Sequence, residues 1–315
     1  MQHAAHGAEA RGRDLTHGRS WRHRAALAAI GLLAGMAGTL ATAATYWPPI
    51  TDPPTEFHHT GRFVWGELLT RDVGAAADFY GKVFGWTFET YGPADDLKTY
   101  TVVLSGGTPI GGRVYAGPRK DKTKPSARWV GLISVPDVKA AASWVEKDGG
   151  KVLMPPKVLG ERGTAALFVD PEGGLFGVIN SATGDPGDYL TQDNQWLWIE
   201  LWADDAAKMA AFYKGIGGYE VVDGAARGES AGFQLRSDGY ARAGILPKPA
   251  KVPTTWVPYI RVASVTDTVV RASATGAKVL MQPTRMHGTS VAILVDPTGA
   301  PFAVAEWAAR AREAQ

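Results

Sequence analysis

Two glutamates placed beside tryptophans are the residues best suited to chemistry. Glu67 lies two residues after Trp65, and Glu200 lies midway between Trp198 and Trp202. Alternate residues of a β-strand share one face, so we expect each carboxylate to lie beside indole rings. Such a carboxylate can have a raised pKa and act as a general acid or base, or it can bind a cationic or hydroxylated ligand. The alternative is a structural carboxylate that is satisfied by an arginine or a backbone N–H.

Composition narrows the remaining chemistry. The chain has no cysteine, which excludes disulfides, thiolate metal sites and a cysteine nucleophile. No spacing indicates a Ser-His-Asp triad, and no phosphate-binding glycine motif follows a strand into a helix. The net charge is +2, but five arginines and two acidic residues lie before residue 45, so the rest is close to neutral. We therefore expect no cofactor and no nucleic-acid partner.

The N-terminal segment has the pattern of an export signal or a membrane anchor. An arginine-rich start precedes Ala25–Ala44, which is 20 residues without a charge, and a small-x-small cleavage pattern ends at Ala43. The same stretch is long enough to cross a bilayer if it is not cleaved. Basic flanks stay in the cytoplasm, so we expect a periplasmic or secreted protein, or one anchored to the inner membrane and facing outward. Membrane contact is expected only through residues 25–44.

The body of the chain is an internal duplication. Trp65-Gly66-Glu67-Leu68 is matched 133 residues later by Trp198-Ile199-Glu200-Leu201, and a Val-Asp-Pro-x-Gly motif also occurs twice. Repeats that keep their order and spacing indicate two copies of one domain. Between the N-terminal segment and the first copy, four prolines predict a stiff spacer. The predicted N-terminal segment, spacer, first domain, linker, second domain and tail span residues 1–44, 45–61, 62–182, 183–194, 195–308 and 309–315.

Each copy is predicted to contain two β-α-β-β-β modules, which makes an α+β fold. Residues 63–70 alternate in polarity as a strand does, and residues 73–84 carry the apolar face of a helix. Asp72 is a candidate N-cap of that helix and Gly85 a candidate stop. The other strands of the first copy are predicted at residues 86–90, 99–104, 109–116, 128–135, 151–154, 164–169 and 174–180, with a second helix at 137–148.

These motifs resemble the vicinal-oxygen-chelate superfamily, which contains glyoxalases, bleomycin-resistance proteins and extradiol dioxygenases. The resemblance rests on Trp-x-Glu-Leu in a first strand, Phe-Tyr in the following helix and Val-Asp-Pro-x-Gly near the end, all found twice in the same order. It covers about three-quarters of the chain and is closest in layout to tandem glyoxalase-like proteins of bacteria. The resemblance implies two α+β domains, each with a cleft that holds a metal ion in the metalloenzymes of the superfamily.

The metal-ligand positions implied by the resemblance carry unsuitable side chains in both copies. Divalent metal ions such as those of the superfamily's metalloenzymes are held by imidazole or carboxylate groups. We therefore expect no metal, and the sequence argues against metal-dependent glyoxalase or dioxygenase activity. The positions are Trp65, Val130 and Gly177 in the first copy and Trp198, Val257 and Ala303 in the second.

Three functions stay open at this point. The first is an exported, metal-independent protein that binds a small aromatic or amphipathic molecule in an aromatic-lined cleft. The second is a lyase- or isomerase-type enzyme that uses Glu67 or Glu200 as its acid/base, and the third is an envelope protein that binds other proteins. A monomer or a homodimer is expected. The candidate ligand-binding residues are Trp65, Trp198, Trp202 and, if its strand face points into the cleft, Arg113.

Overall fold

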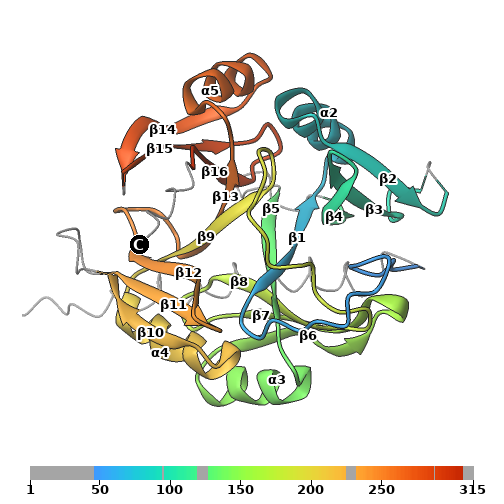
Figure 1. Cartoon of the computed structure of the whole chain (residues 1–315), viewed down its shortest axis with the longest axis vertical. Helices are drawn as coiled ribbons and strands as arrows, with labels where there is room; N and C mark the ends of the chain where they lie inside the picture. The colour runs from blue at the N-terminus through green and yellow to red at the C-terminus, as the bar shows by residue number, and fades with distance from the viewer. Residues whose placement is uncertain (1–45, 94–95, 119–126, 225–231, 287, 308–315) are drawn as a thin grey trace, which may run out of the picture.

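Two eight-stranded mixed sheets, each with two helices, form the tandem domains (Figure 1). The computed structural model describes residues 46–93, 96–118, 127–224, 232–286 and 288–307. The predicted α+β fold of paired β-α-β-β-β modules is confirmed. The predicted export segment lies outside the described residues, and among those that are described no helix is long and apolar enough to cross a membrane.

The first domain contains two modules joined in one sheet. Its elements are β1 (Phe63–Thr70), α2 (Val73–Phe84), β2 (Thr87–Tyr91), β3 (Tyr100–Ser105), β4 (Thr108–Tyr115), β5 (Arg128–Ser134), α3 (Val138–Lys147), β6 (Lys151–Val158), η1 (Gly160–Arg162), β7 (Gly163–Val169) and β8 (Leu175–Ser181). The strand order is β2-β3-β4-β1-β5-β8-β7-β6. The modules meet where β1 pairs antiparallel with β5.

The second domain repeats this arrangement. Its elements are β9 (Trp196–Ala203), α4 (Ala206–Gly217), β10 (Glu220–Asp223), β11 (Phe233–Ser237), β12 (Tyr240–Pro247), β13 (Thr255–Arg261), α5 (Val265–Ala274), β14 (Lys278–Met286), β15 (Thr289–Val295) and β16 (Pro301–Ala305). The strand order is β10-β11-β12-β9-β13-β16-β15-β14, and β9 pairs antiparallel with β13. Equivalent strands therefore hold equivalent places in the two sheets.

Local signals set the helix ends as predicted, but one strand is longer than predicted. The Asp72 side chain accepts a hydrogen bond from the N–H of Ala75 at the start of α2, and Gly85 ends that helix with a φ of 71°. The strand predicted to end at Met154 continues to Val158 as β6. The strand runs through Pro155 and Pro156 because β6 is an edge strand, where a missing N–H breaks no ladder.

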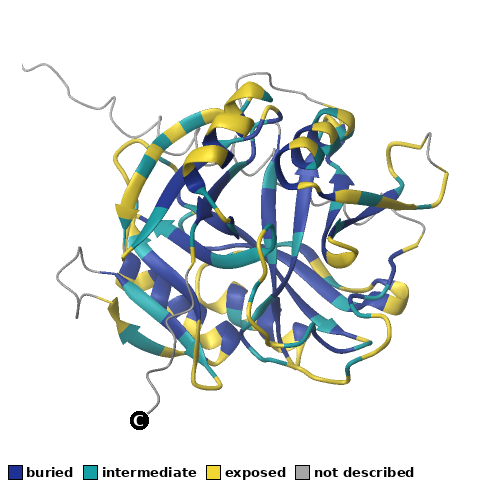
Figure 2. Ribbon diagram, turned by 45° about the horizontal axis from the view of Figure 1, so that its top comes forward, coloured by how far each residue is buried: buried dark blue, intermediate teal, exposed yellow. Residues whose placement is uncertain are grey.

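The helices form the contact between the domains. α2 lies beside α5 and α3 beside α4, so the first module packs on the fourth and the second on the third (Figure 1). Two large clusters of buried apolar side chains draw residues from both domains. The rings of Phe79 and Phe302, for example, lie 6.0 Å apart between centroids, and those of Phe176 and Tyr213 lie 5.0 Å apart. The outer faces of the helices are exposed and the strands behind them buried (Figure 2).

The segment predicted as a spacer is partly docked on the first domain. Trp47 and Ile50 are only 8% and 2% exposed and join the core on the helix-free face of the first sheet. Thr51 and Thr55 fasten the segment further through hydrogen bonds to the Thr183 carbonyl. Its large apolar side chains gain free energy from burial, and its prolines hold an extended backbone suited to this packing.

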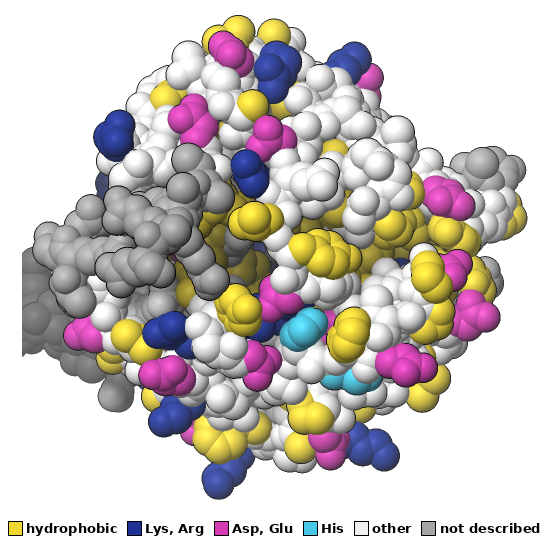
Figure 3. All heavy atoms as spheres, in the orientation of Figure 1, with side chains coloured by type: hydrophobic (Ala, Val, Ile, Leu, Met, Phe, Trp, Pro, Cys, Tyr) yellow, Lys and Arg dark blue, Asp and Glu magenta, His cyan; other side chains and the backbone are white. Residues whose placement is uncertain are grey.

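Charged side chains are scattered on the face of the molecule shown in Figure 3. Acidic and basic groups are interspersed there, without a large patch of one sign. Hydrophobic side chains surround a hollow near the middle of the same face.

Candidate functional site

Glu67 projects from β1 onto the helix-free face of the first sheet, which we call face 1 (Trp65, Glu67, Tyr100, Val130 and Arg162). Its carboxylate is 3% exposed and lies 3.0 Å from Nη1 of Arg162. The Tyr100 hydroxyl donates to Glu67 Oε1 at 2.8 Å, and Trp65 Nε1 donates to the Tyr100 oxygen at 3.0 Å. The predicted pairing of Trp65 with Glu67 on one strand face is therefore present, within a buried polar network.

Arg162 lies at the centre of an aromatic cage on face 1. Its guanidinium carbon is 4.5 Å from the ring centroid of Tyr100, 4.7 Å from that of Trp65 and 5.6 Å from that of Trp47. Nε also donates to the Pro48 carbonyl at 2.9 Å. Cations are attracted to ring faces at such distances. The short turn η1 brings Arg162 here, and the docked segment completes the cage.

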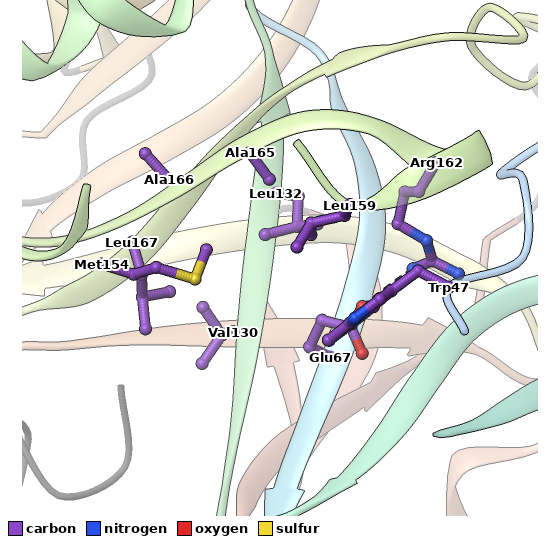
Figure 4. A pocket seen from close by; sticks show the side chains of 10 residues that line it. All are labelled: Trp47, Glu67, Val130, Leu132, Met154, Leu159, Arg162, Ala165, Ala166 and Leu167. Carbon is purple, nitrogen blue, oxygen red and sulfur yellow. Dashed lines mark hydrogen bonds and ion pairs between the residues drawn. The ribbon is translucent and has the colours of Figure 1, made fainter. Parts of the chain in front are cut away.

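Burial dominates the electrostatics of Glu67. It raises the pKa of the carboxyl to about 7, against the lowering effects of Arg162 and of the hydrogen bonds from Tyr100 and Trp65. Glu67, Arg162 and Trp47 converge at one end of a cavity of about 20 Å³, with apolar side chains at the other end (Figure 4). Such a volume admits one water molecule and no organic substrate. The arrangement at Glu67 suits a structural role.

Glu200 occupies the equivalent place on the helix-free face of the second sheet, which we call face 2 (Trp198, Glu200, Trp202, Val257 and Tyr259). The Tyr259 hydroxyl donates to Glu200 Oε2 at 2.5 Å, and Trp198 Nε1 donates to Oε1 at 3.2 Å. Trp198 and Trp202 are partly exposed. The equivalent residues of face 1, Trp65 and Leu69, are 3% and 0% exposed.

Glycines opposite the two glutamates make room for them. A Cβ at Gly112 of β4 would lie 2.4 Å from Glu67 Oε2, and a Cβ at Gly244 of β12 would lie 3.2 Å from Glu200 Cγ. Glycine in a strand interior often marks such a close approach. The roles of these glycines and of Tyr100 and Tyr259 were not predicted from the sequence, although the pair Gly111-Gly112 within a predicted strand was a usable signal.

The residues at the family's metal-ligand positions do not fit a metal ion. Val130 is fully buried in an apolar cluster on face 1, and Val257 and Ala303 are fully buried together in a cluster on face 2. A Cβ at Gly177 would lie 2.4 Å from the Leu132 side chain, so that position is also closed. In the part of the chain that the structure describes, no three His, Asp or Glu side chains are grouped closely enough to hold a metal ion.

Arg113 lies on the helix side of the first sheet and not with Glu67. Its Nη1 donates to the carbonyl of Val73 at the start of α2, and its Nη2 donates to Thr101 Oγ1 at 3.0 Å. The guanidinium carbon lies 5.5 Å from the ring centroid of Phe88. Arg113 therefore ties β4 to the neighbouring helix and strands.

Two family models match the two domains. Residues 56–178 match the Glyoxalase/Bleomycin resistance protein/Dioxygenase superfamily, and residues 198–305 match the Glyoxalase-like domain. The protein named "Putative glyoxylase CFP32" of Mycobacterium tuberculosis is 26% identical over 260 residues, which cover 80% of this chain and 97% of that protein. "Anthracycline biosynthesis protein DauV" of a Streptomyces species is 29% identical over 258 residues, covering 78% and 93%.

Solved structures show the same fold. A Mn(II)-bound glyoxalase from Novosphingobium aromaticivorans superposes with a TM-score of 0.55 at 21% identity, covering 79% of this chain and 83% of that one. A 2,2',3-trihydroxybiphenyl 1,2-dioxygenase from Sphingomonas wittichii gives a TM-score of 0.52 at 16% identity, covering 79% and 91%. At these identities the likeness concerns the fold alone.

Proposed function

Because the chain belongs to the glyoxalase, bleomycin-resistance and dioxygenase superfamily, with two glyoxalase-like domains in tandem, we propose that it binds a small aromatic or amphipathic molecule without a metal ion. The proposed site is face 2. One observation carries the proposal: Trp198 and Trp202 remain partly exposed on either side of Glu200, whereas Trp65 and Leu69 are buried. The core of a soluble protein would carry aliphatic residues at these positions.

The chemistry of face 2 suits a flat ligand. Aromatic rings stack on indole faces, and such pairs contribute about 0.5–1.5 kcal/mol beyond the burial of area. The Glu200 carboxylate is oriented by Tyr259 and Trp198, so it can accept a hydrogen bond from a ligand donor or attract a cation. Met281 and Met286 pack against the same cluster, and their flexible side chains can adapt to ligands of different shape.

Calorimetry and tryptophan fluorescence on the full chain test the proposal. The ligand panel contains aromatic cations, hydrophobic drugs and an anthracycline, since one relative is named for anthracycline biosynthesis. We expect Trp198→Ala to weaken binding at least about tenfold, which corresponds to the loss of one good aromatic contact. Trp307→Ala, which removes a 50% exposed indole from outside face 2, is the matched control. Unchanged affinity in both Trp198→Ala and Trp202→Ala would contradict the proposal.

The hydrogen bond between Tyr259 and Glu200 supports an acid/base enzyme as a second candidate. Burial and the neighbouring Glu200 raise the pKa of Tyr259 above its ordinary value, so the phenol keeps its proton and holds the carboxylate in place. A carboxylate oriented in this way can take a proton from a bound ligand. If mass spectrometry finds that a bound ligand is converted, Glu200→Gln should abolish conversion with little loss of affinity. Conversion at the wild-type rate in that variant would exclude Glu200 as the base.

Export or anchoring at the inner membrane also remains our proposal. It is supported by the uncharged stretch Ala25–Ala44 after an arginine-rich start. A fusion of residues 1–60 to a reporter that is active only outside the cytoplasm should be active. A reporter that stays wholly inside the cell would contradict it, and the size of the exported product separates cleavage from anchoring.

A further inference from the structure

A cavity between the two domains lies apart from the glutamates of faces 1 and 2. Its volume is about 240 Å³, and we call it the interdomain cavity. Equivalent residues of the two copies line it from both sides: Phe63 and Trp65 at the start of β1, and Trp196 and Trp198 at the start of β9. Part of its wall comes from linker residues Pro186, Gly187, Asp188, Tyr189 and Thr191. It shares Trp198 with face 2, but neither Glu200 nor Trp202 lines it.

The walls of the interdomain cavity offer aromatic carbon surface. The rings of Trp129 and Trp196 lie 4.8 Å apart between centroids, at 72° to each other. Their N–H groups are already bonded, since Trp129 donates to the Tyr80 hydroxyl and Trp196 to the Ile110 carbonyl, each at 2.7 Å. These rings therefore contribute apolar surface to the cavity, and a planar ring is the ligand shape that packs on them with the largest contact.

The size of the cavity limits the ligand. An engineered protein cavity of about 150 Å³ holds one benzene molecule. By that scale, 240 Å³ accommodates one ring with substituents or two fused rings.

The charged residues that line the cavity supply more donors than acceptors. Arg242 Nη1 donates to Asp188 Oδ2 at 2.7 Å, and Arg62 Nε lies 3.8 Å from Asp188 Oδ1, so two guanidinium groups share one carboxylate. Arg242 Nη2 makes no hydrogen bond with any described residue and lies 3.8 Å from the exposed Asp238. Asp185, which also faces Arg62, accepts a hydrogen bond from the His59 N–H. A ligand that brings a strong acceptor would complement this edge.

We propose that the interdomain cavity binds a planar aromatic carboxylate of one or two rings. The rings lie against Trp129 and Trp196, and the carboxylate is directed to Arg242 and Arg62. Guanidinium groups match carboxylates through paired N–H donors, which favours this anion over a neutral alcohol or an ammonium group. The site shares Trp198 with face 2 but needs neither Glu200 nor Trp202, so Trp202→Ala distinguishes its failure from that of the proposed function.

Isothermal titration of the full chain with 2-naphthoate and with 2-naphthalenemethanol tests the proposal. The two probes share their rings and differ in charge. We expect 2-naphthoate to bind at least about tenfold more tightly than the alcohol, the difference that one charge-assisted contact makes. Arg242→Met should weaken 2-naphthoate about 10- to 100-fold and leave the alcohol unchanged. Arg285→Met removes an exposed arginine of β14 and is the matched control.

Three results would overturn the inference. These are equal affinity for the two probes, unchanged 2-naphthoate binding in Arg242→Met, and loss of 2-naphthoate binding in Trp202→Ala, which would assign the ligand to face 2. If the unfolding midpoint shows that Arg242→Met does not fold, Arg62→Met provides the same comparison from the other side of Asp188. Arg242→Lys, which keeps the charge, should retain part of the preference for the carboxylate.

Discussion

Arg162 shows how much a single buried charge can depend on its partners. Arg162→Met leaves Glu67 buried without its counter-ion, so we expect the free energy of unfolding at pH 8 to fall by about 3–5 kcal/mol. At that pH, above the raised pKa of Glu67, the carboxylate is ionised. Urea unfolding measures the change.

The double variant Glu67→Gln/Arg162→Met distinguishes the effect of the unpaired buried charge from the effect of lost packing. It should recover part of the loss, because neither charge remains buried alone. Arg285→Met, at an exposed position, should change the free energy of unfolding by less than about 0.5 kcal/mol. If the loss of unfolding free energy in the double variant equals the sum of the losses in the two single variants, the two side chains are not coupled.

Among the elements, the segment before β1 is the one whose docking most affects the first domain. Trp47 is 8% exposed, its ring centroid lies 4.7 Å from that of Tyr100 with the rings tilted at 44°, and its ring covers the Arg162 guanidinium. Trp47→Ala should lower the free energy of unfolding by about 3–5 kcal/mol, as large-to-small changes of buried aromatic residues do. Phe57→Ala, in the same segment but 61% exposed, is the control for urea unfolding. Equally small effects of both changes would mean that the segment is only loosely held.

The Val-Asp-Pro-x-Gly motif of the first domain also holds a helix of the second domain. Asp170 accepts a hydrogen bond from the Tyr213 hydroxyl of α4 at 2.9 Å, and burial raises its pKa to about 6. Because the folded-state pKa exceeds the ordinary 3.8, the folded chain binds this proton more tightly than the unfolded chain. The stability gained from it is complete below about pH 4 and is lost as the pH rises through about 6.

Asp170→Asn tests this pH dependence. The wild-type free energy of unfolding contains a contribution from Asp170 that falls between about pH 4 and 6, and the variant should lack it. Asp148→Asn, at an exposed position after α3, serves as the comparison. Chemical denaturation at several pH values measures the slopes. Identical slopes for wild type and Asp170→Asn would refute the assignment.

Helices and strands were predictable because their signals are local. The predicted helix 73–84 is α2 itself, set by its apolar period and by Asp72 and Gly85. Alternation alone also predicted that each glutamate shares a strand face with its neighbouring tryptophan, and the hydrogen bonds of Trp65 and Trp198 agree with that. The partners of Glu67 were not predictable, because Arg162 lies 95 residues away in the chain and only the completed sheet brings the two together. A pattern within a short stretch of sequence does not indicate a contact between residues so far apart in the chain.

On the scale of the whole molecule, the two domains should unfold as one. The two core clusters beneath the helices mix residues of the two domains, so each domain loses a large part of its core when the other unfolds. We expect a single calorimetric transition whose measured enthalpy equals the van't Hoff enthalpy. Tyr213→Phe, which removes the hydrogen bond to Asp170, should lower the midpoint without splitting the transition. Two resolved transitions would show independent domains.

The packing of the first module on the fourth also sets when a newly made chain can finish folding. Phe79 of α2 leaves the ribosome early, but its neighbour Phe302 belongs to β16, the last strand in the described part of the chain. Until then this apolar helix face remains available to chaperones, because its partner surface does not exist. Because this one core cannot close before β16 emerges, the first module lacks its partner during almost all of synthesis, a state compatible with passage through a narrow translocation channel and with the export that we propose.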